Sequence, residues 1–598
     1  MSIARLKKVT LFGLAGEKRE LLQALQELGC LHLIPLSPAP TEVDSAALPD
    51  ARDARKALRF LTDVPDPRRQ VRRDPAFDVQ AFVREVLELK QTLRDLEDRR
   101  DFLRARIAAV EPWGDLDFAP LEALAGHRLW FYRLPLGKAR ALEDLAVPWA
   151  IVRRDHRFAY VVAIAQEEPP AGLLPVPRTH TGASPLRALR AELDDAEVEL
   201  EEVAARRHAL TRFIYLLSAN IAEAENQSAL AAAERQTMDD AALVAVQGWA
   251  PEDSLEAIRS LSLDRHLACL IEDPRPDESP PTLIEQTDTM AAGADLSVFY
   301  QVPSYRSWDP SLLLFASFSV FFAMILADAG YGLLLLAALL LFWRRMGRTA
   351  SGRSYRLLGL SLTGSAIVYG MLIGSYFGMP PGDGSLLARL NVLRVDDFET
   401  MMTVSIFIGA LHIVLANGMT AWVNRGRRIA FASLGWIAAI IGGLLVWKAA
   451  PGSAPGTFGY GLIALGLGAV LFFNSERPVV RVTDHLWRFA DGLKGVLGAM
   501  GAFGDVLSYM RLFALGLAGA SLAQTFNALA ADVHTALPGL GVLLAVLILA
   551  VGHVLNLGLS VMSGVVHGLR LNFIEFYKWG LPEEGTAFRR FARKEVQP

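Results

Sequence analysis

Two arginines stand inside membrane-length apolar stretches near the end of the chain. Arg511 lies in GAFGDVLSYMRLFALGLAGASLAQTF, and Arg570 lies in LNLGLSVMSGVVHGLRLNFIEFYKWG. A guanidinium stays charged in proteins because its pKa remains above ~12. Placing it at the centre of a bilayer costs roughly 2.5–3.5 kcal/mol on insertion scales. Two such residues in neighbouring hydrophobic segments therefore indicate an ion pathway, and the alternative is that each arginine joins helices through carbonyls and carboxylates.

A polar stripe accompanies Arg570 along its apolar segment. The polar residues step by three or four positions and are His553, Asn556, Ser560, Ser563, His567 and Arg570. This spacing puts them on one face of one helix. Because a polar face inside a bilayer is costly unless it meets protein or water, we expect the stripe to line a polar path.

Arg511 is expected to share its helix face with small and polar residues. These residues are Ser508, Ala514, Ala518, Ser521 and Thr525. Small residues let a second helix approach closely, so this face predicts a helical partner beside the arginine. Asp505 lies a turn or two before Arg511 and Gln524 follows it, which extends the polar positions to both sides of the arginine.

Three further polar residues lie in or beside apolar stretches. Asp328, in LADAGYG, is either a carboxylate that caps a turn or an acid at the mouth of a channel, and the sequence leaves both alternatives open. His412 and Asn417 lack a polar stripe of their own, so we expect them to be hydrogen-bonding groups of a helical core.

Eight apolar stretches are each near the ~20 residues needed to cross a bilayer. They cover about 311–327, 330–344, 356–378, 401–423, 430–449, 457–474, 492–529 and 537–579. The first two are short. The last two exceed one perpendicular crossing, so we expect two long tilted helices at the carboxyl end. The seventh contains Gly501, Gly504, Gly516 and Gly519, at which it could bend.

Basic clusters orient these stretches. Lys and Arg collect in WRRMGRTASGRSYR, VNRGRR, SERPVVRVTDHLWR and FRRFARK, and the alternate connections hold fewer. Because basic loops stay on the cytoplasmic side, we predict a multi-pass protein of a bacterial-type plasma membrane with both termini in the cytoplasm. The first residues show no apolar run long enough for a signal peptide, which agrees with this orientation.

The composition divides the chain near residue 300. Residues 1–290 are rich in Arg, Glu and Asp, whereas residues 311–580 are mostly Leu, Ala, Gly, Phe, Ile and Val. We therefore expect a soluble domain over 1–300 and an all-α membrane domain of eight spans over 301–598. The net charge of −4 gives no reason to expect nucleic acid.

The soluble half has an α+β pattern with two lobes. ARLKKVTLFG, a helix over 17–28 stopped by Gly29, and CLHLIPL begin the first lobe, at about 1–75, and a strand, a helix opened by Pro251 and Glu252, and a second strand within 240–290 complete it. The second lobe, at about 115–175, holds HRLWFYRL, a helix over 138–145, WAIVRR and FAYVVAIA.

Two long helices run between the lobes. Apolar residues recur at three- and four-residue spacing over about 78–110 and about 184–235, with Arg100 and Arg207 each filling one slot. Such seams indicate an antiparallel coiled coil that joins the lobes into a dumbbell. The alternative is an ordinary helical hairpin inside a globular domain.

Motifs of catalysis and cofactor binding are missing from the sequence. It contains no Walker A loop, no GxGxxG after a strand, and no HExxH, CxxC or GxSxG. Cys30 and Cys269 show neither metal spacing nor a disulfide framework. We therefore predict no catalytic site, no cofactor and no metal in this chain.

The chain resembles subunit I of the bacterial and archaeal V/A-type rotary ATPases, the counterpart of subunit a of the eukaryotic V-type ATPases. The segments that carry the resemblance are FFAMILADAGYG, GDVLSYMRLFALGLAGA, HGLRLNFIEFYKW and QGWAPE. The resemblance implies a stator subunit whose Arg511 and Arg570 face a rotating ring of proteolipid subunits and keep the ring carboxylates ionised. It also implies that peripheral stalks bind at the soluble lobes. Further contacts would be with other ATPase subunits, among which a central-stalk adaptor is one candidate, and with membrane lipid.

Two offset half-channels are part of what the resemblance implies. With the predicted orientation, the cytoplasmic side would hold Asp505, Asn572 and Glu575, with Ser508 beside Arg511, and the outer side would hold Gln524, His553, Asn556, Ser560, Ser563 and His567, with Asp328 as a further candidate. The eukaryotic branch has a glutamate where this chain has Ser560, so the outer path here would depend on His567, Asp328 or water. Proton or sodium, net direction, ring size and stalk number are left open.

Two other functions are weighed against the rotary stator. A stand-alone secondary transporter predicts similar halves with broken helices at corresponding positions, and no such repeat is visible in the sequence. A structural scaffold leaves both arginines and the polar stripe unexplained.

Overall fold

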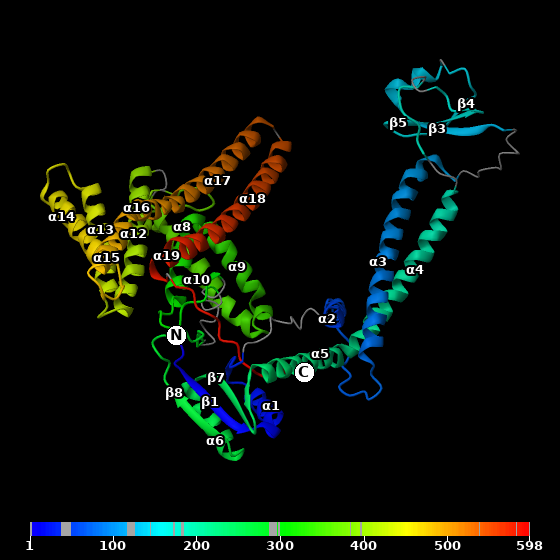
Figure 1. The fold of residues 1–598 in the computed structure, drawn as a ribbon. Helices are drawn as coiled ribbons and strands as arrows, with labels where there is room; N and C mark the ends of the chain where they lie inside the picture. The colour runs from blue at the N-terminus through cyan, green and yellow to red at the C-terminus, as the bar shows by residue number, and fades with distance from the viewer. Residues whose placement is uncertain are drawn as a thin grey trace. The chain divides into compact units, whose positions relative to one another are not determined.

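The computed structural model describes residues 3–37, 49–115, 126–143, 145–170, 174–180, 184–285, 296, 300–382, 384–394, 397–537, 539–581 and 583–596. The chain forms two compact units (Figure 1). The first unit comprises Met1–Gly13, Cys30–Ile34 and Ala245–Arg590, and the second comprises Leu14–Gly29, Pro35–Val244 and Phe591–Pro598. The first unit thus contains strands from both ends of residues 1–300 together with all the apolar helices.

A sheet in the first unit joins strands from distant parts of the chain. Its order is β2-β7-β1-β8, for β1 (Leu6–Leu14), β2 (His32–Ile34), β7 (Leu243–Pro251) and β8 (Ala268–Glu272), and a fifth strand, β6 (Met238–Asp240), pairs with β7. β1 pairs antiparallel with β8, and β2 pairs antiparallel with β7. Helix α6 (Leu255–Asp264) lies between β7 and β8 in the chain, after a short 3-10 turn at Glu252–Ser254, as predicted.

The second unit begins with helix α1 (Lys18–Leu28), which confirms the predicted helix end. Gly29 takes a left-handed conformation at φ +65°, which suits glycine because it lacks a Cβ. Helix α1 packs against the later helix α5 (Ile214–Gln236).

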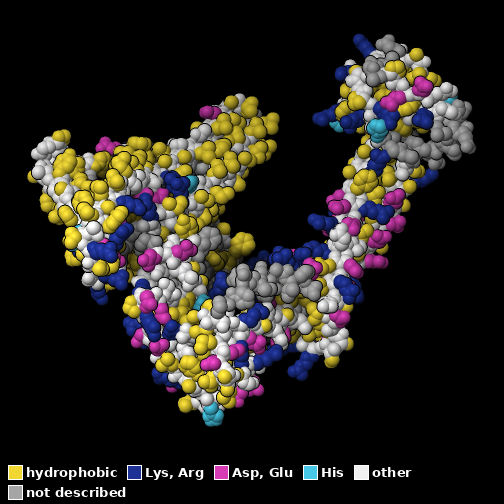
Figure 2. Space-filling model, viewed as in Figure 1, with side chains coloured by type: hydrophobic (Ala, Val, Ile, Leu, Met, Phe, Trp, Pro, Cys, Tyr) yellow, Lys and Arg dark blue, Asp and Glu magenta, His cyan; other side chains and the backbone are white. Residues whose placement is uncertain are grey.

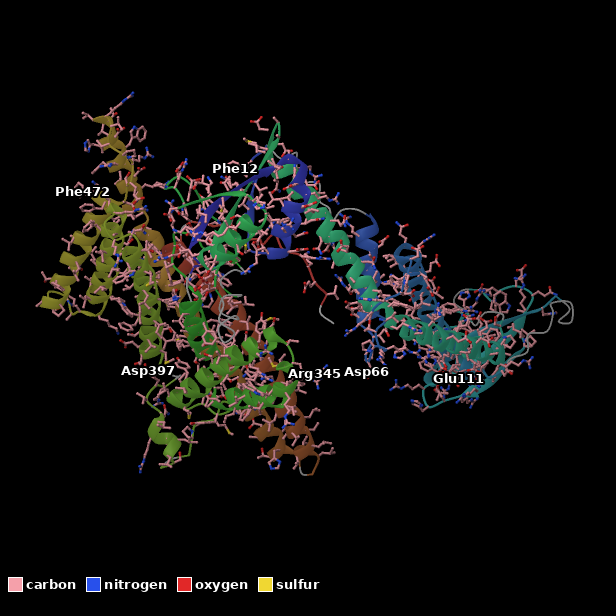
Figure 3. All side chains as sticks on the ribbon, turned by 90° about the horizontal axis from the view of Figure 1, so that it is seen from below. Phe12, Asp66, Glu111, Arg345, Asp397 and Phe472 are labelled. Carbon is pink, nitrogen blue, oxygen red and sulfur yellow. The ribbon has the colours of Figure 1, made fainter. Side chains whose placement is uncertain are left out.

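Two long helices of the second unit, α3 (Val79–Val110) and α4 (Leu186–Leu210), pack antiparallel. Cross-helix ion pairs fix the direction, because Arg206 meets Glu85 at 2.5 Å near one end and Arg190 meets Glu111 at 2.7 Å near the other. Figure 3 shows Asp66 and Glu111 toward opposite ends of this pair. The buried seam residues are Leu103, Val110, Leu186, Leu189 and Ala196.

The second seam is not one continuous helix, which corrects the expectation for 184–235. A 3-10 turn at Thr211–Phe213 separates α4 from α5. The reason is a competing set of hydrogen bonds: Thr211 Oγ1 donates to the His208 carbonyl at 2.6 Å, and the N–H of Val71 donates to the Arg212 carbonyl at 2.8 Å. Helix α2 (Pro49–Thr62) packs at this junction. Arg207 stacks 4.0 Å from the Phe60 ring and donates to the Phe60 carbonyl, which explains a cation in a core slot.

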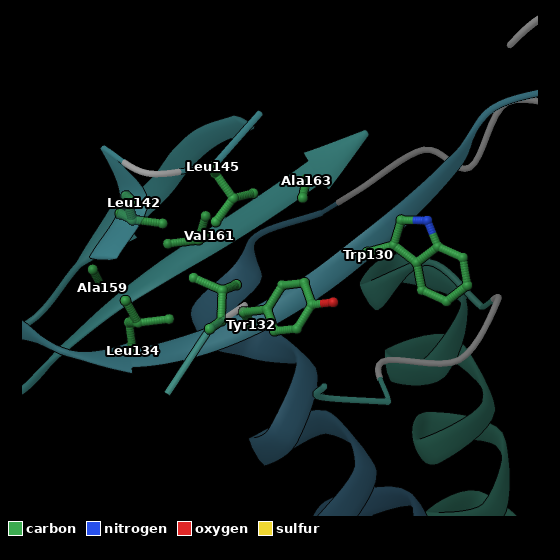
Figure 4. Close-up of a cluster of buried hydrophobic side chains, with 9 residues drawn as sticks. Trp130, Tyr132, Leu134, Leu142, Leu145, Ala159, Val161 and Ala163 are labelled. Atoms are coloured by element: carbon green, nitrogen blue, oxygen red, sulfur yellow. The ribbon is translucent and has the colours of Figure 1, made fainter. Parts of the chain in front are cut away.

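A small antiparallel sheet forms the far lobe of the second unit. Its order is β3-β5-β4, and the strands are β3 (Arg128–Pro135), β4 (Trp149–Arg154) and β5 (Phe158–Ala165). One face buries the cluster shown in Figure 4, which includes Trp130, Tyr132, Leu134, Leu142 and Val161. The helix expected over 138–145 is instead a 3-10 helix at Leu136–Leu142, where Gly137 in the first turn disfavours an α-helix.

The apolar half of the first unit consists of helices. They are α8 (Ser311–Leu326), α9 (Ala329–Met346), α10 (Ala350–Ile373), α11 (Leu386–Leu390), α12 (Phe398–Val423), α13 (Arg428–Lys448), α14 (Ala454–Phe473), α15 (Thr483–Leu497), α16 (Ala499–Ser508), α17 (Met510–Ala536), α18 (Leu540–Arg570), a π-helix (Leu571–Phe576) and α19 (Tyr577–Gly580). Within the described residues, seven helical segments are long and apolar enough to cross a membrane. Figure 2 shows hydrophobic side chains over much of the visible surface of α13, α14, α17 and α18.

Helix α8 is shorter than these seven helical segments, with 16 residues and a length of about 24 Å. Its direction nevertheless alternates with that of α9. Along α8, Ser319 meets Ser361 at 2.8 Å, and buried Phe318 packs against Leu358. Further along, Ala323 packs against Ala366, so α8 runs parallel to α10. Helix α9 runs antiparallel to α10, because its first turn lies against Ile367 and its last turn accepts a hydrogen bond from Arg356.

The seventh apolar stretch breaks at positions that the sequence did not indicate. Thr483–Ala536 spans 54 residues, about 81 Å of helix, and is interrupted at Gly498 and Tyr509 rather than at the four expected glycines. Two of those glycines are packing positions instead. A Cβ added at Gly516 would lie 2.6 Å from the Met324 carbonyl, and one at Gly519 would lie 3.1 Å from Ser560 Oγ.

Candidate functional site

Arg511 is the second residue of α17 and lies two residues after the break at Tyr509. Its side chain is half-buried, and its Nη1 is buried without a hydrogen-bond partner among the described residues. Arg570 and Glu575 lie within electrostatic range of it. An ionised donor left without a partner in the protein costs free energy, so Arg511 requires water or a partner from outside this chain.

Arg570 is the last residue of α18 and is exposed. The six-residue π-helix that follows it turns Asn572 and Glu575 into the bundle, where they are 0% and 4% exposed. π-Helical turns are rare and are frequent at functional sites. Across the part of the chain that the structure describes, no carboxylate lies within ion-pair distance of Arg511 or Arg570.

Four ionisable groups therefore gather where α17 and the end of α18 meet. His567 is half-buried and lies within electrostatic range of both arginines. Three of the four groups carry a buried atom without a partner in the described chain: Nη1 of Arg511, Nδ1 of His567 and Oε2 of Glu575. Because buried polar atoms in proteins are nearly always satisfied, this group of atoms indicates bound water or a missing partner.

The polar stripe on α18 changes from buried to exposed along its length. Asn556 is 1% exposed and Ser560 is 6% exposed, whereas Ser563 and His567 are half-buried and Arg570 is exposed. The stripe is thus covered by protein at one end and open at the arginine.

The covered end of the stripe is a satisfied hydrogen-bond network. Asn527 Oδ1 lies 3.0 Å from His553 Nε2, and because an amide oxygen only accepts, Nε2 donates and Nδ1 accepts from Tyr331 OH at 2.7 Å. Asn556 Nδ2 donates to Tyr331 OH at 3.0 Å and to the Gly519 carbonyl at 2.9 Å. Tyr331 was not singled out in the sequence, where it carries no spacing that relates it to the stripe.

The face of α17 that contains Arg511 is open to the surroundings. Beyond the arginine its exposed residues are Ala514, Ala518, Ser521, Gln524 and Thr525. Their side chains are small or polar, so a helix of another protein could approach the backbone closely here. Helices α17 and α18 lie side by side (Figure 1), so this face and the exposed end of the polar stripe adjoin.

On the other side of Arg511, three of the four expected polar residues, all except Glu575, have hydrogen-bond partners within the chain. Asn572 Oδ1 accepts from Ser317 Oγ at 2.5 Å. Asp505 Oδ2 accepts from Lys578 Nζ at 2.7 Å and from Trp579 Nε1 at 2.8 Å. Ser508 does not orient Arg511, because its hydroxyl donates to the Asp505 carbonyl at 2.9 Å. Lys578 and Trp579 were missed in the sequence because their partner lies 73 and 74 residues away.

Asp328 has the geometry of the turn-capping alternative. It is 3% exposed, and its carboxylate accepts four hydrogen bonds. The donors are the N–H groups of Tyr331, Phe377 and Gly378 at 2.9–3.0 Å and Ser375 Oγ at 2.7 Å. A carboxylate engaged in this way caps α9 and holds the 375–378 loop.

His412 and Asn417 are buried core groups, as expected. His412 Nδ1 lies 2.8 Å from Tyr509 OH, and Asn417 Nδ2 donates to the Ile413 carbonyl at 3.0 Å. Among the described residues, no group of three or more His, Cys, Asp and Glu side chains could hold a metal ion.

Comparison with known proteins finds no matching family model. The chain is 26% identical over 600 residues to the V-type ATP synthase subunit I of Chlamydia pneumoniae, covering 86% of each chain. It is 27% identical over 630 residues to the V-type ATP synthase subunit I 1 of Treponema pallidum, covering 96% of this chain and 97% of the relative. Archaeal relatives are named A-type ATP synthase subunit I. A crystal structure of the cytoplasmic N-terminal domain of subunit I, homologous to subunit a of V-ATPase, matches 44% of this chain and 99% of that chain at 18% identity and a TM-score of 0.21.

Proposed function

We propose that this chain, similar over most of its length to subunit I of the V-type and A-type ATP synthases, is the stationary ion-carrying membrane subunit of a rotary ATPase. Its partner at Arg511 and Arg570 would be a rotating proteolipid ring whose subunits carry carboxylates in the membrane. The chain would have no catalytic site of its own, and nucleotide chemistry would take place in other subunits.

One observation carries this proposal. Arg511 and Arg570 lie together at an open, small-residue face, and none of the described carboxylates of the chain pairs with them. A charge that is costly in a membrane and left unpaired by its own protein calls for an opposite charge from elsewhere. A carboxylate presented by a helix of a neighbouring subunit satisfies both the charge and the close approach.

Electrostatics then couples ion movement to rotation. A ring carboxylate beside the arginines has its pKa lowered by their positive charge and releases its ion. Once it moves away into lipid, desolvation raises its pKa, so it travels in the neutral form. The two arginines lie between the ion-loading and ion-releasing positions and block a direct leak.

Two half-channels would serve the ring from opposite sides. The outer path would be lined by Gln524 and the polar stripe of α18, comprising His553, Asn556, Ser560, Ser563 and His567, with Asp328 fixing the loop beside it. The cytoplasmic path would be lined by Asn572 and Glu575, with Asp505 and Ser508 on the same side. With a serine at position 560, the outer path would depend on His567 and water to relay protons.

The soluble part would serve as the anchor of the stator. We propose a dumbbell in which the α3–α4 pair and its continuation α5 form an antiparallel coiled coil between two α/β lobes, and the lobes hold peripheral stalks. The membrane part would have eight spans, since α8 runs parallel to α10 and α9 runs antiparallel to it. Both termini would then lie in the cytoplasm, which the basic clusters favour, and the membrane would be a bacterial-type plasma membrane.

The test is ATP-driven acidification of vesicles that contain the assembled complex, for wild type and Arg511→Ala. ATP hydrolysis and subunit content are measured on the same vesicles. We expect lost acidification with intact assembly, and Arg345→Ala, an exposed arginine in the last turn of α9, is the matched control with wild-type acidification. Normal acidification by Arg511→Ala would show that the arginine has only a structural role between helices.

A further inference from the structure

The two chain segments that carry the arginines are joined by an ion pair in which the carboxylate is mostly buried and the lysine is exposed. Asp505, on α16 and six residues before Arg511, accepts hydrogen bonds from Lys578 and Trp579, which lie eight and nine residues after Arg570. The side chain of Asp505 is 17% exposed. The Trp579 ring also packs against the Trp436 ring of α13, with the ring centroids 5.0 Å apart. Asp505 is therefore held by two donors and is not free to move toward Arg511.

A second connection passes through α12. Tyr509, at the break two residues before Arg511, is 0% exposed, and its OH lies 2.8 Å from His412 Nδ1. The His412 ring stacks on Phe576, the last residue of the π-helix after Arg570, with centroids 4.2 Å apart and planes at 8°. Gly409 makes room for this arrangement, because a Cβ added there would lie 2.5 Å from the Tyr509 ring.

Both connections tie the same two backbone irregularities together. One irregularity is the interruption between α16 and α17, and the other is the π-helix between α18 and α19. A shift of either segment by one helical turn, about 5.4 Å, would break the ion pair and unstack His412 from Phe576. Oδ2 of Asp505 and the OH of Tyr509 already have hydrogen-bond partners within the chain. Neither connection therefore depends on these atoms lining an ion path.

We propose that Asp505, Lys578 and Trp579, with Tyr509 and His412, are positioning residues that hold Arg511 and Arg570 at a common depth. We call this set the register clamp. The inference rests on the proposed function and assigns Asp505 a role distinct from that of an ion-carrying carboxylate. If the clamp fails, the arginines no longer meet the same ring carboxylate, and ions leak between the two sides without rotation.

The test is a charge exchange in the assembled complex. Asp505→Lys and Lys578→Asp are made singly and together, and the ratio of acidification to ATP hydrolysis and the passive proton leak are measured in the same vesicles. Each single exchange places two like charges together, and we expect the ratio to fall at least about fivefold. In the double variant the pair is restored with reversed direction, and we expect the ratio to recover to more than half of the wild-type value.

The milder variant Asp505→Asn guards against a failure to assemble, since its amide oxygen still accepts from Trp579 Nε1. We expect an intermediate loss in the ratio. Tyr509→Phe, which removes one hydroxyl, is expected to lower the ratio by about twofold. Asp491→Asn is the matched control, because Asp491 pairs with Arg477 at 2.8 Å near α15 without joining the two arginine segments, and it should keep the wild-type ratio.

Two results would overturn the clamp. A double variant as defective as Asp505→Lys, with Asp505→Asn equally defective although its amide oxygen still accepts from Trp579, would show that a carboxylate is needed at position 505 itself, as an ion-carrying group requires. Wild-type ratios in both single variants would show that the pair sets no register. Arg511→Ala in the same preparation separates these results from a failure of the proposed function: normal acidification by that variant rejects the ion-carrying role itself, whereas lost acidification leaves it standing whatever happens to the clamp.

Discussion

The arginines of the α3–α4 pair and those of the membrane part are treated in opposite ways by the fold. In the helix pair, Arg104 and Arg206 each meet a glutamate on the other helix at 2.5–2.6 Å, and Arg190 meets Glu111, the residue after α3, at 2.7 Å. In the membrane part, neither Arg511 nor Arg570 has such a partner among the described carboxylates. An exposed ion pair is worth only about 0–1 kcal/mol, so the paired arginines contribute little. The unpaired ones lie in the apolar helical part of the chain, where a lone charge is costly, and under the proposed function their partner belongs to the ring.

The largest expected effect comes from Arg511→Lys. A lysine keeps the positive charge but not the planar, multi-donor guanidinium, and it deprotonates more readily in a dry site. We expect acidification to be lost while assembly remains. Wild-type coupling in Arg511→Lys would remove the contrast between the two sets of arginines, because a positive charge without the guanidinium geometry would then suffice.

The second effect concerns a charge that the fold does satisfy. Asp328→Ala removes the acceptor for four buried donors, and each unsatisfied donor costs about 1–3 kcal/mol. We therefore expect a destabilisation of about 3 kcal/mol or more, seen as a lower unfolding temperature of the purified protein. Asp484→Ala removes an exposed carboxylate that also accepts two backbone N–H groups and serves as the control, with a much smaller change. Unchanged stability of Asp328→Ala would favour the channel-mouth alternative.

His567→Ala is expected to slow proton flux several-fold without loss of assembly. The reason is that His567 is the group of the polar stripe nearest Arg570 that can exchange a proton, and its Nδ1 has no partner in the described chain. His553→Gln is the comparison variant, because both ring nitrogens of His553, unlike those of His567, have partners in a hydrogen-bond network. Equal flux for wild type and His567→Ala across pH would show that the outer path lies elsewhere.

A smaller effect is predicted where the carboxyl-terminal tail meets the sheet. Arg589 N–H donates to His32 Nδ1 at 2.9 Å, and burial together with the Arg589 charge lowers the pKa of His32 below its usual value. The folded form thus favours neutral His32, so this contribution to tail docking is complete above the ordinary histidine pKa of about 6.5 and is lost as the pH falls through the lower folded pKa. We expect faster proteolysis of the tail in acid. In His32→Gln, whose amide oxygen accepts without titrating, the rate should not depend on pH, and a rate that rises in acid as in wild type would reject this role.

The smallest effect is expected for the paired arginines. Arg104→Ala removes an exposed pair with Glu197, and we expect a loss of at most ~1 kcal/mol in the free energy of unfolding, with unchanged coupling. A loss of coupling in this variant would show that surface pairs of the helix pair carry function and would remove the contrast between the two regions.

The sequence predicts much of this site because helical spacing is a local property. The stripe from Asn556 to Arg570 lies along one helix, and the stop of α1 at Gly29 follows from glycine itself. The break at Tyr509 was not predictable from local spacing, because Tyr509 packs against another helix, where a Cβ added at Gly409 would lie 2.5 Å from its ring. The π-helix after Arg570 and the separate helix α15 were missed for the same reason, since α- and π-helical segments share the same apolar composition and differ only in tertiary packing.

The most direct measurement is cysteine cross-linking between this chain and the ring in the assembled complex. In a background with Cys30→Ser and Cys269→Ser, single cysteines replace Ala514, Ala518 and Ser521 on the exposed face of α17, and Ala523, which is buried on the same helix. The account predicts cross-links from the three exposed positions to ring residues near the ring carboxylate, and none from position 523. Cross-links absent from all three exposed positions in an assembled complex would contradict the claim that Arg511 meets its partner there.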